Sequence, residues 1–274
     1  MAPRKQRLTQ QERHAQIAAL LRHEGTVRIA TLARAFDVTT ETVRRDLDEL
    51  AESGALNRTY GGGASRSLID EPGIGVRSQL HAAERGRIAL AAAQMVEQGD
   101  VLMIDGGSTT RAFAQMLAAR ELRVTVVTNC LPVAKALGAN PHGRTILCCG
   151  DYVAAEEGVY GTDAGDFIRR FKANKAFIGA GGVTSEGVTD ADSLGSSIKR
   201  AMMERSGQTI LLVDRSKFGV AQFERVCPLS GIDTMVADTA PPKRLAGVLH
   251  DAGVRVVIAE DSAGRVHDRA RHRD

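Results

Sequence analysis

The chain has 274 residues, of which 43% are hydrophobic and 25% charged, and its formal net charge is +3. This length suits two domains, and this composition is typical of a soluble globular protein. No apolar run approaches the roughly 20 residues that span a bilayer. The first residues lack a secretion signal, and the four cysteines lack metal-binding or redox spacing. We therefore expect a cytoplasmic protein with no membrane partner, no metal and no cofactor.

Apolar residues recur at helical spacing in three segments near the N-terminus. The first helix is predicted over residues 11–23. The second covers residues 29–36, where apolar side chains fall three and four positions apart, and residues 37–38 make a turn. The third runs through residues 39–50 and begins with threonines, which are good helix caps. This order predicts a helix-turn-helix.

The polar face of the third helix carries small hydroxyls near its start and then two arginines. In the major groove of DNA, hydroxyls and amides at a helix start meet phosphate, and a guanidinium pairs with guanine. Most arginine-rich helix faces are simply exposed to solvent, so this pattern alone fits both interpretations about equally. The candidate DNA-binding residues of this helix are Thr39, Thr40, Thr42, Arg44 and Arg45.

Two short extended segments flank these helices. Residues 26–28 precede the second helix, and residues 55–60 follow the third and end in the glycines 61–63. Three helices and a small hairpin make a winged helix-turn-helix. Arg58 and Tyr60 are expected on the wing, where a basic residue meets backbone phosphate.

Composition divides the chain into a DNA-binding domain at 1–60, a linker at 61–75, a sensing domain at 76–260 and a tail at 261–274. The linker is rich in Gly, Ser and Pro. The tail holds Arg, His and Asp with little to bury, so we expect it to be disordered. The first 66 residues carry 11 Lys/Arg against 8 Asp/Glu, which places the basic excess with the DNA-binding module.

Short apolar strands alternate with helices through the rest of the chain. This alternation predicts an α/β, Rossmann-like domain whose mostly parallel sheet is covered on both faces. The helices are expected at residues 85–97, 108–119, 131–137, 163–171 and 194–206, and the strands at 101–104, 124–127, 145–148, 175–178, 209–213, 234–237 and 254–258.

Small polar residues are concentrated where these strands end, which is where such sheets bind ligands. Residues 105–110 combine two glycines with three hydroxyls at a helix start, an arrangement that suits a phosphate but equally suits a tight turn with a cap. They form neither a Walker P-loop nor a dinucleotide fingerprint. Three further strand ends, at 128–129, 150–151 and 179–182, favour a pocket for a small anionic polyol.

Six segments, in this order, resemble the DeoR-type bacterial repressors. The resemblance covers about residues 11–238 and implies an N-terminal winged helix and a C-terminal sensor similar to ribose-5-phosphate isomerase. Such sensors take phosphorylated sugars or related metabolites and relieve repression of a catabolic operon. Cys130 and Cys149 depart from the family at the border of the expected pocket, where a serine and a glycine are common. The matching segments are 41–47, 104–110, 127–129, 175–182, 199–203 and 216–219.

We therefore expect a transcriptional repressor of a carbohydrate or polyol operon. Its partners are a double-stranded DNA operator and a phosphorylated sugar or sugar acid, and paired half-sites require a dimer or tetramer. The loop 105–110 is expected to hold the phosphate and Lys217 to supply the counter-charge. The candidate effector-binding residues are Asp105, Gly107, Ser108, Thr109, Thr110, Thr128, Asn129, Gly150, Gly179, Gly181, Gly182, Asp190, Lys199 and Lys217.

The alternative is a sugar-phosphate isomerase with an accessory N-terminal module. Isomerisation needs a general base beside the carbonyl carbon. In the isomerase fold that the sensor resembles, carboxylates follow the strand that here ends in the glycines of 179–182. The seven histidines also fall away from the pocket motifs. With binding groups present and no base, we expect a regulator and not an enzyme.

Overall fold

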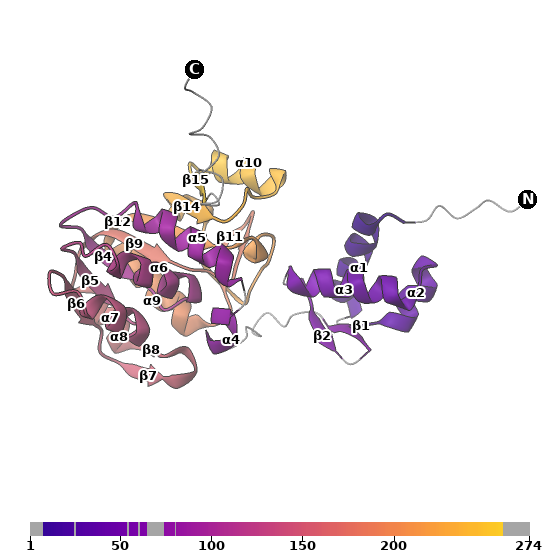
Figure 1. Ribbon diagram of the computed structural model, residues 1–274, viewed down its shortest axis with the longest axis horizontal. Coiled ribbons are helices and arrows are strands. Elements are labelled where there is room, and N and C mark those ends of the chain that lie inside the picture. Colours follow the sequence, from indigo (N-terminus) through magenta and orange to yellow (C-terminus); the bar gives the residue numbers. More distant parts are fainter. Residues whose placement is uncertain are drawn as a thin grey trace, which may run out of the picture. The chain divides into compact units, whose positions relative to one another are not determined.

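The computed structural model describes residues 8–24, 26–53, 55–59, 61–64, 74–79 and 81–259. The chain divides into two compact units, Met1–Asp70 and Glu71–Asp274, each with its own apolar clusters (Figure 1). Among the described residues, none of the helices has the length and apolar character that a membrane crossing requires.

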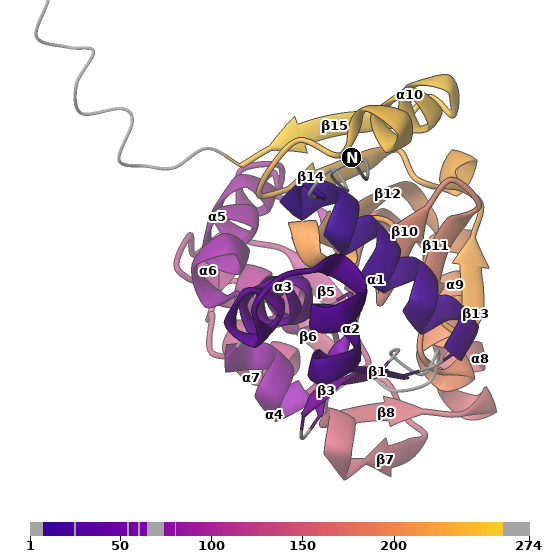
Figure 2. The same cartoon turned by 90° about the vertical axis from the view of Figure 1, so that its right-hand side faces the viewer.

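The N-terminal unit is the predicted winged helix-turn-helix. Its three helices pack around fully buried side chains such as Ile17, Val43 and Leu47, and a small antiparallel sheet of order β1-β3-β2 completes it (Figure 2). The elements are α1 (Gln10–Glu24), β1 (Thr26–Arg28), α2 (Ile29–Phe36), α3 (Thr40–Glu52), β2 (Asn57–Thr59) and β3 (Gly62–Ala64).

Strand β3 lies inside the segment 61–75 that the sequence marks as a linker. It pairs with both β1 and β2. A Cβ on Gly62 would stand 1.9 Å from the carbonyl oxygen of Val27, so only glycine fits at this point of the sheet. The composition of this segment suggests a linker, but Gly62 is required because two strands approach each other closely at this point. The wing therefore extends beyond residue 60.

Helix α3 is held on α1 by a buried ion pair. Asp46 is 1% exposed, and Arg13 donates to its two carboxylate oxygens at 2.6 and 2.8 Å. The hydrogen bond from Arg13 to Asp46 raises the pKa of Arg13 against the opposing effect of burial. This two-point contact fixes the orientation of α3, because a guanidinium and a carboxylate can meet in this way in only one plane.

The C-terminal unit is built on a seven-stranded sheet of order β15-β14-β12-β9-β4-β5-β6, in which every neighbouring pair is parallel. Its strands are β4 (Val101–Ile104), β5 (Thr125–Thr128), β6 (Arg144–Leu147), β9 (Ala173–Ile178), β12 (Ser206–Val213), β14 (Thr234–Ala237) and β15 (Arg255–Ile258). The helices are α4 (Ile74–Gln79), α5 (Ala82–Ala93), α6 (Ser108–Ala118), α7 (Leu131–Gly138), α8 (Thr162–Arg169), α9 (Ser193–Glu204) and α10 (Lys243–Asp251).

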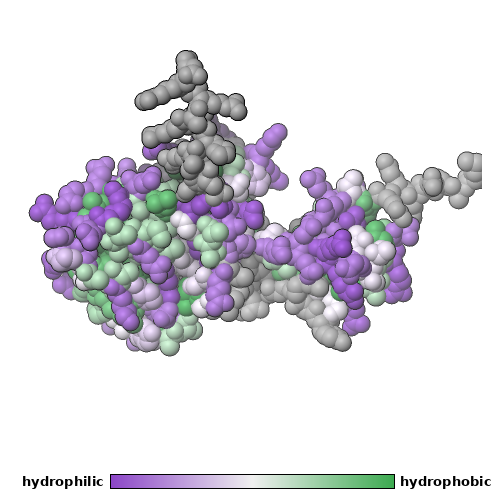
Figure 3. All heavy atoms as spheres, viewed as in Figure 1, coloured by the Kyte–Doolittle hydropathy of each residue, from purple (hydrophilic) through white to green (hydrophobic). Residues whose placement is uncertain are grey.

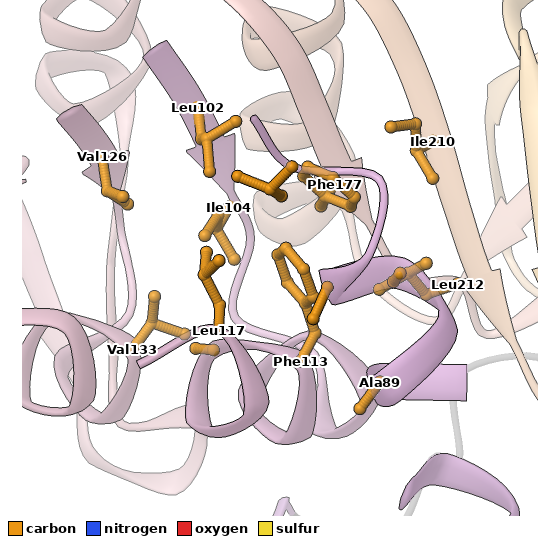
Figure 4. Packing of buried hydrophobic residues seen from close by; sticks show 14 of the residues in the cluster. Ala89, Leu102, Ile104, Phe113, Leu117, Val126, Val133, Phe177, Ile210 and Leu212 are labelled. Atoms are coloured by element: carbon orange, nitrogen blue, oxygen red, sulfur yellow. The ribbon is translucent and has the colours of Figure 1, made fainter. Parts of the chain in front are cut away.

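Successive residues of each strand enter different cores because side chains alternate across a sheet. Leu102 and Ile104 pack with α5, α6 and α7, whereas Met103 packs with α8 and α9 on the other face. The first core contains Phe113 stacked on Phe177, with ring centroids 4.2 Å apart (Figure 4). The predicted two-sided α/β architecture is confirmed, and the predicted helices and strands are present with ends shifted by a few residues.

The strand order reverses between β4 and β9. From β4 the chain adds β5 and β6 on one side, and from β9 it adds β12, β14 and β15 on the other. Doubly wound sheets open a crevice at such a reversal, beyond the carboxyl ends of the two strands. The residues that follow β4 and β9 are Asp105 and Gly179, so these two lie at the reversal of strand order.

Several elements were not expected from the sequence. Except for α10, they are short and contain no continuous apolar run or long periodic segment, which are the signals that sequence patterns offer. Helix α10 does carry such a signal, because Leu245, Val248 and Leu249 recur at helical spacing, and the sequence analysis overlooked it. The unexpected strands are β7 (Asp151–Val153), β8 (Gly158–Tyr160), β10 (Gly182–Thr184), β11 (Gly187–Asp190) and β13 (Glu224–Cys227), and the unexpected helices are α4 and α10.

Candidate functional site

The start of α3 presents hydroxyl groups in a defined arrangement. Thr39 is the cap: its hydroxyl oxygen accepts from the Thr42 amide at 3.1 Å and lies 2.9 Å from the Thr42 hydroxyl. Thr40 is exposed and is the first residue of the helix. The structure therefore gives Thr39 a capping role and leaves Thr40 on the surface.

Arg44 and Arg45 lie on the exposed face of α3. Their side chains are 55% and 76% exposed, and both approach the Glu41 carboxylate, at 3.4 and 3.9 Å. Exposed ion pairs of this kind are weak, so either guanidinium can exchange Glu41 for a phosphate or a base at little cost. Figure 3 shows hydrophilic residues over most of this unit's visible face. Arg58 lies on β2, but its side chain and Tyr60 lie outside the described residues.

The carboxylate of Asp105 joins the ends of β4 and β9. Its Oδ1 accepts from the Gly107 amide at 3.0 Å and the Thr110 hydroxyl at 2.7 Å, and its Oδ2 accepts from the Gly179 amide at 3.0 Å. Burial acts to raise the pKa of Asp105. The charge of Lys199 and the three hydrogen bonds outweigh burial, so this pKa lies below its ordinary value. Asp105 thus positions the loop, and its oxygens are already occupied.

Lys199, on α9, lies between two carboxylates. Its Nζ is 2.6 Å from Oδ2 of Asp190 and 3.2 Å from Oδ2 of Asp105, and all three side chains are at least nine-tenths buried. Burial acts to lower the pKa of Lys199, but the two carboxylates hold it above its ordinary value. Lys199 therefore serves as a counter-ion to both carboxylates.

Asn129 follows β5 beside this cluster and is 1% exposed. Its Nδ2 donates to the Val159 carbonyl at 3.2 Å, whereas its Oδ1 is a buried acceptor with no partner among the described residues. A Cβ on Gly106 would stand 3.8 Å from Nδ2 and 3.4 Å from the Tyr160 hydroxyl. The backbone at Gly106 therefore lies in van der Waals range of both polar side chains.

Three of the predicted effector-binding residues make contacts within the protein. These contacts account for the residue type at each position without a bound effector. The Thr128 hydroxyl donates to the Ile104 carbonyl at 2.7 Å and accepts from the Cys130 amide at 3.1 Å. A Cβ on Gly150 would lie 2.5 Å from the Tyr160 carbonyl oxygen, and one on Gly182 would lie 2.0 Å from the carbonyl oxygen of Val220. These residues hold neighbouring backbones at close range.

A cleft of about 480 Å³ opens at the start of α6. Ser108 lines it, and the adjoining Thr109 is buried. The cations in its lining are Arg111 and Lys135, whereas Lys217 lies in the 3₁₀ helix Arg215–Lys217 (η2) after β12 and does not line this cleft. The role of Lys217 as the counter-charge therefore stays a prediction.

Three side chains near the site were missed from the sequence. Arg111 lies one turn into α6, and helical spacing from Ser108 would have found it. Tyr160 ends the three-residue strand β8, and Gln222 lies in the irregular segment between η2 and β13. Neither short segment carries a pattern from which its place could be predicted.

Comparison with known families identifies both units. Residues 13–67 match the DeoR-like helix-turn-helix domain, and residues 80–239 match the DeoR C terminal sensor domain. The chain belongs to the DeoR family. It is a DNA-binding transcriptional regulator with a sensor domain, and the isomerase alternative is not supported.

Relatives of this DeoR-family protein match it over nearly the whole length. The glycerol-3-phosphate regulon repressor of Escherichia coli K12 is 32% identical over 92% of this chain and 100% of that protein. The L-fucose operon activator of Haemophilus influenzae is 31% identical over 86% of this chain and 94% of that protein. Ribose 5-phosphate isomerase A from Methanocaldococcus jannaschii aligns with a TM-score of 0.38 and 17% identity, over 50% of this chain and 55% of that one.

Proposed function

We propose that this protein represses a carbohydrate or polyol operon in the cytoplasm and that a phosphorylated metabolite in the C-terminal unit releases it from DNA. The observation that carries the proposal is the loop after β4, where Asp105 fastens a glycine-rich helix start beside the strand-order reversal. Names of relatives that refer to glycerol-3-phosphate and L-fucose support this class of operon. Binding to paired half-sites supports a dimer or tetramer.

The effector's phosphate is placed at the start of α6. Gly107 is the N-cap and supplies no side chain, so the first amides of the helix can donate to an anion together with the hydroxyls of Ser108 and Thr109. Lys135 lines the same cleft and is exposed. We propose Lys135 as a second source of the counter-charge beside Lys217 on this ground.

Replacing Ser108 and Thr109 together with alanine is expected to abolish the response to effector, because both hydroxyls that meet the phosphate are removed. Operator affinity without effector should stay within about twofold, since an effector acts only through its preference for one state. The measurement is operator binding with and without the phosphorylated sugar that gives the largest thermal shift in a compound screen.

The matched control replaces Thr184 and Ser185, an adjacent hydroxyl pair at the turn between β10 and β11. This control should respond as the wild type does. A Ser108/Thr109 variant that still responds at the wild-type effector concentration would place the phosphate elsewhere, with Gly179 to Gly182 as the next candidate.

Arg111 connects the effector loop with α4. Its Nε donates to the Gly106 carbonyl at 3.2 Å, and its two amino groups donate to the Glu157 carboxylate at 2.6 Å and the Glu156 carbonyl at 2.5 Å. The Glu156 carboxylate pairs with Arg77 on α4, the first helix after the segment that leads from the DNA-binding unit. We assign this chain of contacts to the transmission of effector binding.

Arg77→Met is expected to leave effector affinity unchanged and to reduce the effector's influence on operator affinity to less than about one third of the wild-type factor, because the ion pair with Glu156 is lost. Glu156→Gln should have the same effect, and the double variant should add nothing further if both act through this pair. Titrations of effector and of operator measure the two affinities. Additive losses in the double variant would contradict the assignment.

A further inference from the structure

Gln222 has a buried amide group that forms no hydrogen bond among the described residues. The residue is 6% exposed, and neither Nε2 nor Oε1 has a partner there. Its backbone amide, by contrast, donates to the Thr189 hydroxyl at 3.0 Å, which fixes the segment on β11. The main chain is therefore satisfied while the side chain offers one donor group and one acceptor.

This amide lies against the charged cluster of the effector site. A Cβ on Gly181 would stand 2.9 Å from Cγ of Gln222 and 3.2 Å from Oδ1 of Asp190. Asp190 in turn lies 2.6 Å from Lys199. Glycine at 181 therefore leaves the space that the Gln222 side chain occupies, and it brings that side chain beside the carboxylate.

An unpartnered buried amide destabilises a folded protein, because the hydrogen bonds that it made with water are not replaced. Native proteins keep few such groups, and each calls for a specific reason. A methionine would fill the same volume without this cost. The position beside Asp190 and Lys199 offers a reason, since a bound molecule there would supply both missing hydrogen bonds.

We propose that Gln222 is a specificity-determining residue of the effector site and that its amide binds a hydroxyl group at the uncharged end of the effector. A hydroxyl both donates and accepts, which matches the two unused functions of the amide. Asn129 Oδ1 is a second buried acceptor without a partner. Because its Nδ2 is bound to the Val159 carbonyl, the oxygen faces away and calls for a further hydroxyl donor.

The unpartnered acceptors narrow the class of effector. Oε1 of Gln222 and Oδ1 of Asn129 both need a hydrogen-bond donor. A hydroxyl group can donate to them, whereas an ionised carboxylate or phosphate only accepts. The end of the effector that meets these two residues therefore carries hydroxyl groups, which favours a monophosphate of a neutral sugar or polyol over a sugar-acid phosphate or a bisphosphate. This inference rests on the proposed function.

The test is isothermal titration of the full chain with matched pairs of compounds. The pairs are glycerol 3-phosphate with 3-phosphoglycerate, and glucitol 6-phosphate with 6-phosphogluconate. In any pair that binds, the neutral member should bind at least about tenfold more tightly. Gln222→Met should weaken the neutral member by about tenfold, the effect of one or two lost hydrogen bonds. The same variant should melt at a higher temperature without ligand.

The control is Gln208→Met, which makes the same change at an exposed position on β12 and should alter neither property. A structural role for Gln222 would instead lower the melting temperature of the Gln222→Met variant.

Equal or tighter binding of the acid member overturns the inference, and so does unchanged affinity in Gln222→Met, while the proposed function stands in both cases. If no phosphorylated compound binds, the result contradicts both this inference and the proposed function. The comparison of affinities within each pair uses wild-type protein alone. It therefore tests the inference even if the Gln222→Met variant fails to fold.

Discussion

Replacing both Arg44 and Arg45 with alanine is expected to weaken operator binding by roughly 100-fold or more, since each guanidinium that reads a base contributes about 1–3 kcal/mol. Their only described ion-pair partner is Glu41, and both side chains are more than half exposed, so the unit should remain folded without them. The measurement is the affinity for an operator selected from a random DNA library, made at several salt concentrations.

The salt series separates two ways in which these arginines act. Loss of a phosphate contact weakens all sequences alike and reduces the dependence of affinity on salt, whereas loss of a base contact reduces discrimination at one position. The matched control is the double alanine variant of Arg169 and Arg170, which removes the same two charges from an exposed part of α8. Equal affinity of the Arg44/Arg45 variant and wild type would remove α3 as the recognition helix.

The exposed face of α3, the candidate DNA-binding surface, could be predicted from the sequence because its residues are contiguous. Thr39 to Arg45 span two turns of one helix, and helical periodicity alone separates the buried Val43 from the exposed Arg44 and Arg45. The end of the wing was harder to predict. Glycine is required at position 62 because Val27, which is distant in the sequence, lies against it in the neighbouring strand. Composition cannot show such a contact.

The cluster of polar residues that forms the candidate effector site could be predicted only in part, for a similar reason. Asp105, Asn129 and Gly179 follow long apolar strands, and parallel strands bring their carboxyl ends to one edge. Gln222 and Tyr160 reach the same place from short segments without an apolar pattern. Lys217 follows β12, whose Leu212 packs in the same apolar cluster as Phe113 of α6, and its role as the counter-charge stays a prediction.

Lys199→Met is expected to lower the free energy of unfolding by about 3–5 kcal/mol at pH 7. The substitution fills a similar volume but removes the ammonium group that lies between the buried carboxylates of Asp105 and Asp190. Lys172→Met, an exposed lysine in the turn after α8, is the control and should change stability little. Urea unfolding followed by circular dichroism measures the difference.

The pH dependence of this loss has a definite sign. In the wild type the pKa of Asp105 is held below its ordinary value, so its contribution to stability is present at neutral pH and is lost as the pH falls through the folded-state pKa. Without Lys199, burial and mutual repulsion favour protonated carboxylates, so the variant should gain stability as the pH falls from 7 towards their ordinary range. The difference between the two proteins should therefore shrink at pH 5. Adding Asp190→Asn to Lys199→Met should restore part of the loss at pH 7, because one of the two carboxylate charges that faced the Lys199 ammonium is removed. A loss of equal size at both pH values, unaffected by Asp190→Asn, would mean that Lys199 acts through packing and not through its charge.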